Sequence, residues 1–224
     1  MKLNIEDLKD FDVRYEMFKR AVRFVDYELV DGDIYEFGVY SGRSLALLNA
    51  ALEEGASSIH HVPFRRRVIG LDSFEGLEEN EHPRWEKGKF KYNHSFHPLL
   101  EKGGLVTEQV VYDLFEAYDF EKPLILKGLF KDVLKEHKMG AASIVHIDCD
   151  LYEPTKEVLF SEGLFQTGTV LLFDDWFNFK SDPNNGEQKA FNEFLRVHDE
   201  WNAIEYFSYA TFGKSFILRK TDNK

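Results

Sequence analysis

The stretch of sequence that most constrains this chain is DIYEFGVYSGRS, which covers residues 33–44. It predicts a short buried strand that ends near Glu36, a turn through Gly38 and Gly42, and then the start of a helix. Glycine has no Cβ and readily takes positive φ, so a turn built on glycines lets a ligand approach the backbone. The first N–H groups of the following helix point toward such a ligand. The stretch therefore favours a strand–turn–helix unit that binds a small molecule, with a purely structural junction as the alternative.

The turn differs from the glycine pattern of nicotinamide-binding proteins. That pattern is G-x-G-x-x-G, and Glu36 stands where its first glycine would be. An acid at this strand end can accept hydrogen bonds from a ligand or from the turn itself. A nicotinamide-dependent oxidoreductase is therefore kept only as an alternative.

Segments typical of strands and of helices alternate along the rest of the chain. Apolar residues recur at helical spacing in residues 12–30, 108–118, 130–137, 155–162 and 191–198. Short apolar runs typical of strands cover residues 67–72, 123–128, 143–148 and 169–176, and runs at 203–207 and 215–219 form a terminal hairpin. This alternation predicts an α/β fold with a mostly parallel sheet and helices on both faces.

Length and patterning predict a single domain over residues 1–224. We expect its N-terminal helix, residues 12–30, to pack on the sheet as a wall of the ligand cleft. Residues 75–104 carry no sustained apolar period, yet they include Trp85 and Phe90 among several aromatic residues. A connection this long in a compact domain is usually functional or disordered, and the aromatic residues argue against disorder. We therefore predict an active-site lid.

Charge and composition exclude several classes of partner. The net charge of −12 argues against nucleic acid, because phosphate contacts require concentrated Lys and Arg. The one basic cluster, Arg65 to Arg67, is interpreted as a solvated loop. No run of about 18 apolar residues occurs, so no membrane span is expected. The single cysteine, Cys149, and the lack of an apolar signal-peptide core predict a cytoplasmic protein.

Acidic residues stand at the ends of four predicted strands. They are Glu36 after the first, Asp72 after the second, Asp148 after the fourth, and Asp174 and Asp175 after the fifth. In open α/β sheets, ligands bind beyond the carboxyl ends of the strands. Scattered surface acids would not fall on successive strand ends, so these residues predict where the site lies.

Asp72 has a specific expected role. An acid that ends the second strand of a nucleotide-binding half commonly accepts hydrogen bonds from ribose hydroxyls. A helix cap near Ser73 or a solvated carboxylate is the alternative.

Asp148, Asp174 and Asp175 predict a metal site. If the fourth and fifth strands are neighbours, their ends lie about 5 Å apart. Like charges so close repel unless they are neutralised, and carboxylate oxygens suit a hard cation such as Mg²⁺. Zinc is not expected, because Cys149 lies between acids that suppress its thiolate and the adjacent histidines at positions 60 and 61 are poorly placed to chelate. One protonated or helix-capping acid is the alternative to a metal.

Five blocks of sequence together resemble the macrocin O-methyltransferase family, which belongs to the class I S-adenosylmethionine-dependent methyltransferases. The blocks are Tyr35–Val39, Leu71–Leu77, Lys127–Phe130, His146–Tyr152 and Phe173–Trp176. Members of this family methylate sugar hydroxyls of natural products with S-adenosylmethionine and Mg²⁺. The resemblance implies a Rossmann-like, seven-stranded sheet in the order 3-2-1-4-5-7-6, with the seventh strand antiparallel.

The resemblance also implies roles for individual residues. Asp148, Asp174 and Asp175 match the metal ligands. The expected cofactor-binding residues are Glu36, Phe37, Gly38, Gly42, Ser44, Asp72, Ser73, Phe74 and Asp148. The expected catalytic residues are Asp148, Asp150 and Asp175. Because Mg²⁺ is a weaker Lewis acid than zinc, a positioned general base is expected as well, and its candidates are Asp150 and Asp175, with His94 and His97 of the lid as outsiders.

We therefore expect Mg²⁺-dependent transfer of a methyl group from S-adenosylmethionine to a hydroxyl of a glycoside. A catechol or phenolic acceptor is the alternative, but Leu151 replaces the lysine that catechol-type enzymes carry three residues after the first metal acid. A non-catalytic module that only binds cofactor is a third reading, against which the acidic cluster argues. A homodimer is the assembly considered.

Overall fold

The computed structural model describes residues 2–56, 65–80, 82 and 85–221, so the histidine pair at positions 60 and 61 lies outside the described residues. The helices are α1 (Ile5–Phe11), α2 (Arg14–Tyr27), α3 (Arg43–Ala56), α4 (Glu108–Ala117), α5 (Phe130–Glu136), α6 (Tyr152–Leu159), the 3₁₀-helix η1 (Phe179–Ser181) and α7 (Gly186–Val197). The strands are β1 (Asp33–Phe37), β2 (Val68–Asp72), β3 (Leu124–Lys127), β4 (Ala142–Ile147), β5 (Val170–Phe173), β6 (Trp201–Tyr209) and β7 (Gly213–Lys220).

The seven described strands form one sheet in the order β3-β2-β1-β4-β5-β7-β6. The first five strands pair in parallel, while β7 runs antiparallel to both β5 and β6. The predicted fold, a Rossmann-like class I methyltransferase sheet with a C-terminal antiparallel hairpin, is thereby confirmed. The order of the strands reverses between β1 and β4, which is where ligands bind in sheets of this kind.

The central strands are buried on both faces, because successive side chains enter opposite layers. In β1, Ile34 packs in one layer, whereas Tyr35 and Phe37 pack in the other. In β4, Ile144 and Val145 divide in the same way. Burying a side chain of this size contributes about 1.5–3 kcal/mol. The alternation therefore holds β1 and β4 rigidly in the middle of the molecule.

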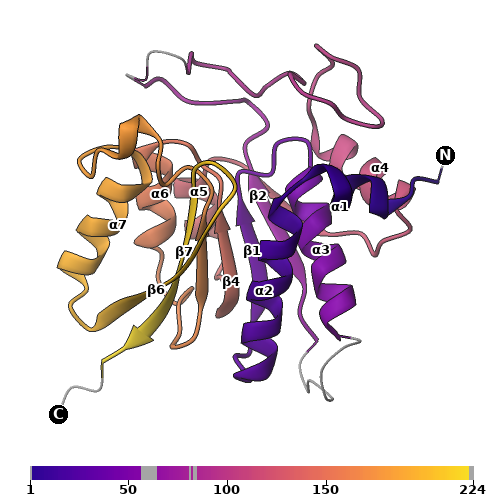
Figure 1. Ribbon diagram of the computed structural model, residues 1–224. Helices are drawn as coiled ribbons and strands as arrows, with labels where there is room; N and C mark the ends of the chain where they lie inside the picture. Colours follow the sequence, from indigo (N-terminus) through magenta and orange to yellow (C-terminus); the bar gives the residue numbers. More distant parts are fainter. Residues whose placement is uncertain (1, 57–64, 81, 83–84, 222–224) are drawn as a thin grey trace.

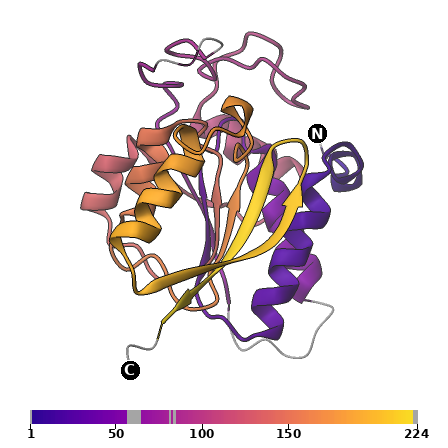
Figure 2. The ribbon, with the colours of Figure 1, turned by 60° about the vertical axis from the view of Figure 1, so that its left-hand side comes forward.

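Helices cover both faces of the sheet, as Figures 1 and 2 show. Helices α2, α3 and α4 pack on one face, and α5, α6 and α7 pack on the other. Helix α2 corresponds to the helix predicted over residues 12–30, and its buried face includes Phe18, Val22 and Val25. Helix α6 begins at Tyr152 rather than at the predicted Thr155, so that Pro154 falls within its first turn. Helix α1 is not predicted from the sequence, because its 7 residues carry too little periodicity.

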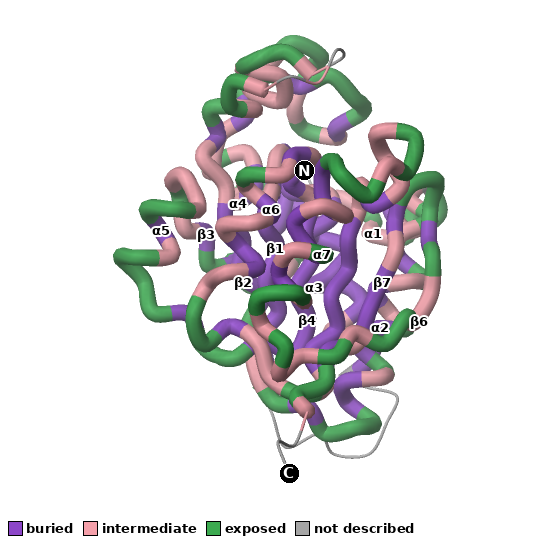
Figure 3. Tube along the Cα trace, turned by 90° about the vertical axis from the view of Figure 1, so that its left-hand side faces the viewer, coloured by how far each residue is buried: buried purple, intermediate pink, exposed green. Residues whose placement is uncertain are grey.

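The connection between β2 and α4 lies beyond the carboxyl ends of the strands (Figures 1 and 2). Its described part contains no helix, and a single β-bridge joins Tyr92 to Leu105. Figure 3 shows it as mostly exposed and half-buried chain above a buried sheet. The segment has the position expected of the lid predicted over residues 75–104, whose function remains a prediction.

Arg66 corrects the interpretation of the basic cluster. Arg65 and Arg67 are largely exposed, but the Arg66 side chain is 1% exposed and lies 3.0 Å from Asp26 in an ion pair. Its guanidinium also donates to the carbonyl oxygen of Gly32 at 3.2 Å. The cluster is therefore not a solvated loop throughout, because its middle residue anchors α2. None of the described helices is long and apolar enough to cross a bilayer.

Candidate active site

A cleft of about 350 Å³ lies at the carboxyl ends of the central strands, and this volume is in the range of small-molecule sites. Five of the expected cofactor-binding residues line the cleft, namely Gly38, Ser44, Asp72, Ser73 and Asp148. Four others lie outside its lining, namely Glu36, Phe37, Gly42 and Phe74. Further lining residues include Arg14, Tyr40, Arg43, Phe90, Leu129, Phe130, Asp150, Leu151, Asp174 and Asp175.

The turn after β1 requires glycine at two positions. Gly38 has φ +91°, and a Cβ at this residue would overlap the carbonyl oxygen of Asp148. Gly42 has φ +84°, and its Cβ would lie 2.9 Å from Cγ1 of Val111. Both residues occupy the left-handed region that side chains disfavour. Gly38 therefore allows the turn to pack directly on the backbone of Asp148, and Gly42 allows it to pack on Val111 of α4.

Glu36 lies behind this turn rather than in the cleft. It is fully buried, and its carboxylate accepts a hydrogen bond of 2.8 Å from Oγ of Ser44. Its other oxygen lies 3.1 Å from Nδ1 of His146. Glu36 thus connects β1 to the first turn of α3 and to β4. Phe37 and Phe74 are also buried, so these residues shape the wall from behind.

Asp72 faces the cleft and joins the end of β2 to the glycine turn. Its two oxygens accept hydrogen bonds of 2.7 Å from the backbone N–H groups of Tyr40 and Phe74. Burial raises the pKa of Asp72, although the backbone hydrogen bonds act in the opposite direction. Each carboxylate oxygen has a second lone pair, so Asp72 can still accept hydrogen bonds from a ligand.

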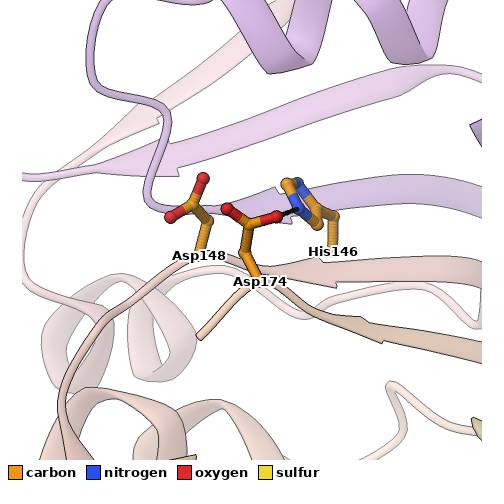
Figure 4. Close-up of side chains that lie close together, drawn as sticks. All are labelled: His146, Asp148 and Asp174. Carbon is orange, nitrogen blue, oxygen red and sulfur yellow. Dashed lines mark ion pairs between the residues drawn. The ribbon is translucent and has the colours of Figure 1, made fainter. Parts of the chain in front are cut away.

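The acids after β4 and β5 converge at the opposite end of the cleft. Oxygens of Asp148, Asp150 and Asp175 lie within 4.8 Å of one another, and a second group contains His146, Asp148 and Asp174. Figure 4 shows the second group, with the carboxylates of Asp148 and Asp174 side by side. The three predicted metal acids are thus divided between two groups that share Asp148.

Electrostatics distinguish Asp174 from its neighbours. Burial and mutual repulsion raise the pKa of Asp148, Asp150 and Asp175 well above the usual value. Burial acts on Asp174 too, but Arg14 and His146 lower the pKa of Asp174 below its usual value. Nε2 of His146 lies 3.6 Å from Oδ1 of Asp174, which is an ion pair rather than a hydrogen bond. Asp174 therefore favours the ionised form more strongly than its three acidic neighbours do.

The donors of this cluster fit a hard divalent cation. All of the acids supply oxygen, and the buried Oδ1 of Asp174 has no hydrogen-bond partner among the described residues. Cys149 is a poor ligand and a poor nucleophile, because burial raises the pKa of its thiol and Sγ donates to the carbonyl oxygen of Phe37. The donor set is therefore one of oxygen ligands, the kind that hard divalent cations prefer, rather than of sulfur ligands.

Known proteins share both the sequence and this arrangement of elements. The sequence profile of the macrocin O-methyltransferase (TylF) family matches residues 12–209 of the chain. The chain belongs to this family. The resemblance inferred from the five sequence blocks is thereby confirmed.

Individual proteins are also similar to this chain in sequence or in structure. The chain is 30% identical over 168 residues to the 8-demethyl-8-(2,3-dimethoxy-alpha-L-rhamnosyl)-tetracenomycin-C 4'-O-methyltransferase of Streptomyces olivaceus. That match covers 73% of this chain and 60% of the relative, so the chain spans well under the relative's full length. The structure of the O-methyltransferase NovP matches with a TM-score of 0.67 at 23% identity, over 93% of this chain and 80% of NovP. An O-methyltransferase from Bacillus cereus in complex with SAH matches with a TM-score of 0.54 at 16% identity, over 95% of this chain and 90% of that one. At these identities the two structures support the fold alone.

In this family member, the segment over the cleft is fastened to the glycine turn. Oη of Tyr40 accepts from the N–H of His94 at 2.8 Å and donates to the carbonyl oxygen of Tyr92 at 3.1 Å. A guanidinium nitrogen of Arg43 donates to the carbonyl oxygen of Phe96 at 3.1 Å. The segment is therefore attached to Tyr40 of the turn and to Arg43 at the start of α3.

His97 of this segment is buried, and both of its ring nitrogens have partners. Nε2 lies 3.2 Å from the carbonyl oxygen of Ser41, and Nδ1 accepts from the N–H of Leu99. Burial lowers the pKa of His97. These contacts hold the segment in place and leave His97 unsuited to the role of general base.

Three residues of the site are missed by the sequence reasoning. Arg14 of α2 reaches Asp148 and Asp174, with 3.3 Å between Nη1 and Oδ2 of each acid. Glu187 of α7 accepts from the N–H of Asp175 at 3.0 Å, and Asn178 donates to the Asp175 carboxylate. The contact of Arg14 with Asp148 joins segments 134 residues apart, and the sequence has no signal for it. Asn178 and Glu187 lie only 3 and 12 residues from Asp175, but the sequence indicates a turn-rich loop over residues 181–187 and not a partner for that acid.

Proposed function

We propose that this protein transfers a methyl group from S-adenosylmethionine to a hydroxyl oxygen of a glycoside, with Mg²⁺ at the acidic cluster. The observation that carries the proposal is the packing of Gly38 on the backbone of Asp148. This contact sets the glycine turn, a binding surface for a nucleoside, directly beside carboxylates that suit a metal and an acceptor. Because the chain spans 60% of its Streptomyces olivaceus relative, its activity and substrates are proposals throughout.

The cofactor would be held by the glycine turn and by Asp72. Asp72 is the only predicted strand-end acid on the β2 side of the described cleft. One of its oxygens accepts from Tyr40 of the turn, and the other accepts from Phe74, which follows β2. Its remaining lone pairs suit the hydroxyls of a ribose. The Bacillus cereus protein of the same fold is described in complex with SAH, and we propose the same class of cofactor for this chain.

The metal would be held by Asp148, Asp174 and Asp175, with Asp150 beside them. When bound, Mg²⁺ lowers the pKa of a coordinated hydroxyl and fixes its orientation. Residues of the chain would have two remaining tasks, namely to accept the proton of the acceptor hydroxyl and to exclude water from the cleft. Asp150 and Asp175 are the candidates for the first task, because burial raises the pKa of both carboxyl groups and a higher pKa makes a carboxylate a stronger base. Asp150 also has a left-handed φ of 60°, a strained conformation of a kind that gathers at functional sites.

Exclusion of water would be the task of the segment fastened to Tyr40 and Arg43. Attack of an oxygen anion on a sulfonium removes charge, so a dry cleft favours it. If this segment closes as a lid while it stays attached to the turn, it would cover both ligands and exclude water from the cleft. The lid, its boundaries at 75–104, the cytoplasmic location and a homodimer remain predictions.

A sugar acceptor is favoured over a catechol. The Streptomyces olivaceus relative is named for a reaction on a rhamnosyl compound. Leu151 lines the cleft where catechol-type enzymes carry a lysine. An apolar side chain at this position cannot assist deprotonation of a phenol, although it can pack on a sugar ring.

The test is transfer of labelled methyl from S-adenosylmethionine to nucleotide-linked sugars and natural-product glycosides, in Mg²⁺ and in EDTA. We expect product only with Mg²⁺. Asp175→Asn and Asp148→Asn should both abolish turnover, and Asp175→Asn should leave the dissociation constant for S-adenosylmethionine nearly unchanged. Asp132→Asn, a change at an exposed acid of α5, is the matched control and should behave as wild type. Full activity in EDTA would refute the metal assignment, and transfer to catechols but not to sugars would refute the acceptor class.

A further inference from the structure

Arg14 brings a positive charge from the N-terminal helix into the acidic cluster. It lies in the first turn of α2 and lines the cleft. Its Nη1 lies 3.3 Å from Oδ2 of Asp148 and 3.3 Å from Oδ2 of Asp174. A single guanidinium nitrogen thus contacts both acids at once.

The other side of the guanidinium is held by Asp12. Nε donates to Oδ1 of Asp12 at 3.0 Å, and Nη2 donates to Oδ2 at 2.9 Å. Asp12 also accepts from the backbone N–H of Arg14, so the two residues form a local unit between α1 and α2. If Arg14 leaves the acids, it keeps a charged partner on its own segment.

A divalent ion would need the same oxygens. Mg²⁺ binds carboxylate oxygens at about 2.0–2.1 Å, and an ion shared by Oδ2 of Asp148 and Oδ2 of Asp174 would lie beside Nη1. Two cations next to each other repel strongly in a partly buried site. Of the other cations near Asp174, His146 contacts Oδ1 and lies beneath the acids, so it does not compete for Oδ2.

We propose that Arg14 and a divalent cation are alternative counter-ions of Asp148 and Asp174, so that metal binding displaces the guanidinium and shifts the start of α2. This inference rests on the proposed function in one respect, namely that the acidic cluster binds a metal. Coupling of this kind is reciprocal. If metal binding weakens the contacts that hold the start of α2 in place, those contacts lower the affinity for the metal by the same factor. Arg14 would thereby set the metal affinity of the site and couple it to the segment that joins α1 and α2.

The experiment measures metal binding directly. Dissociation constants for Mn²⁺ and Mg²⁺ are determined by calorimetry, and free Mn²⁺ by electron paramagnetic resonance, for wild type, Arg14→Gln and Arg14→Lys. Arg23→Gln, at an exposed position of the same helix, makes the same change of net charge away from the cleft. We expect Arg14→Gln to bind Mn²⁺ about tenfold more tightly than wild type. The Mn²⁺ affinity of Arg14→Lys should lie between those of wild type and Arg14→Gln, and the affinity of Arg23→Gln should equal that of wild type.

Hydrogen exchange provides a second readout that needs no variant. Saturating Mg²⁺ should accelerate amide exchange in residues 12–18 of wild type, and EDTA should reverse the effect. This measurement decides the matter if Arg14→Gln does not fold. Unchanged or weaker metal binding by Arg14→Gln, equal tightening by Arg23→Gln, or slower exchange in residues 12–18 with Mg²⁺ would each overturn the proposal.

The outcomes separate this inference from the proposed function. Metal binding to wild type that is unaffected by Arg14→Gln leaves the Mg²⁺-dependent function standing and removes only the role of Arg14. Binding to neither wild type nor Arg14→Gln removes both.

Discussion

Glu36 and His146 face each other on the neighbouring strands β1 and β4, fully buried, with 3.1 Å between Oε2 and Nδ1. Ser44 of α3 donates to the other oxygen of Glu36, and His146 contacts Asp174 on its far side. A buried line of polar groups therefore runs from the first turn after the glycines to an acid of the cluster. This line ends 3.6 Å from Oδ1 of Asp174, so it connects the start of α3 to the acidic cluster.

The first prediction concerns the pH dependence of stability. Burial lowers the pKa of His146, but Asp174 and Glu36 together raise it from 6.5 to about 10. The folded protein thus holds a proton that the unfolded chain loses near pH 6.5. The stabilisation is complete below that pH and is lost as the pH rises toward about 10, with a size of roughly 5 kcal/mol at most.

This can be measured by urea unfolding in EDTA between pH 6 and pH 10. The free energy of unfolding of wild type should fall across this range more steeply than that of His146→Gln. His137→Gln, at an exposed residue after α5, should keep the wild-type slope. Equal slopes for wild type and His146→Gln would show that His146 is neutral in the folded protein.

The second prediction concerns Asp72. Asp72→Asn loses the charge and sets a side-chain N–H₂ group against the N–H of Tyr40 or Phe74. Because hydrogen bonds to a charged group contribute about 1.5–3 kcal/mol, affinity for S-adenosylmethionine should fall about tenfold or more. Calorimetry measures this, with Glu79→Gln at an exposed acid as the control. An unchanged dissociation constant in a folded Asp72→Asn protein would rule out contact with the cofactor.

The third prediction concerns the hydroxyl of Tyr40. Tyr40→Phe removes the hydrogen bonds to His94 and Tyr92 and a longer contact of 3.4 Å with Oδ1 of Asn93. It keeps the ring, which packs edge-on at 5.5 Å from Phe90. Two hydrogen bonds at about 0.5–1.5 kcal/mol each predict roughly tenfold faster amide exchange in residues 90–97. The KM for the acceptor should rise with it if this segment closes over the cleft.

Hydrogen exchange with mass spectrometry measures the first effect. Tyr27→Phe, whose ring is exposed, is the matched control. Exchange in residues 90–97 that stays at the wild-type rate would mean that the segment is held without Tyr40.

Much of this site could be predicted because its parts are local in sequence. The glycine turn follows a strand directly, and each acid follows its own strand, so the parallel sheet brings them together. Asp72, Asp148, Asp174 and Asp175 all reach the cleft for this reason.

Contacts between distant segments could not be predicted in this way. Arg14 and Asp148 are separated by 134 residues, and an arginine in the first turn of an amphipathic helix has no signal that names its partner. The buried position of Glu36 could not be predicted either, because it depends on contacts with Ser44 and with His146, which is 110 residues away. Periodicity indicates which face of an element is buried, but not which charge on another element it meets.

The fourth prediction isolates the close approach of Gly38 to Asp148. Gly38→Ala adds a Cβ that overlaps a backbone carbonyl and also disfavours φ +91°. Gly163→Ala separates the two effects. Gly163 has φ +75°, and among the described residues nothing lies within 4 Å of its added Cβ. Positive φ alone costs about 1 kcal/mol for alanine, so Gly163→Ala should lose about that much.

Gly38→Ala should lose at least 2 kcal/mol more, because the backbone at Asp148 has to move. The displaced Asp148 should also weaken binding of Mn²⁺, whereas Gly163→Ala should leave it unchanged. Unfolding in urea and Mn²⁺ titration measure the two effects. Equal destabilisation by the two variants, with equal Mn²⁺ affinity, would mean that the turn does not position Asp148. The contact between Gly38 and Asp148 would then not connect the glycine turn to the acidic cluster.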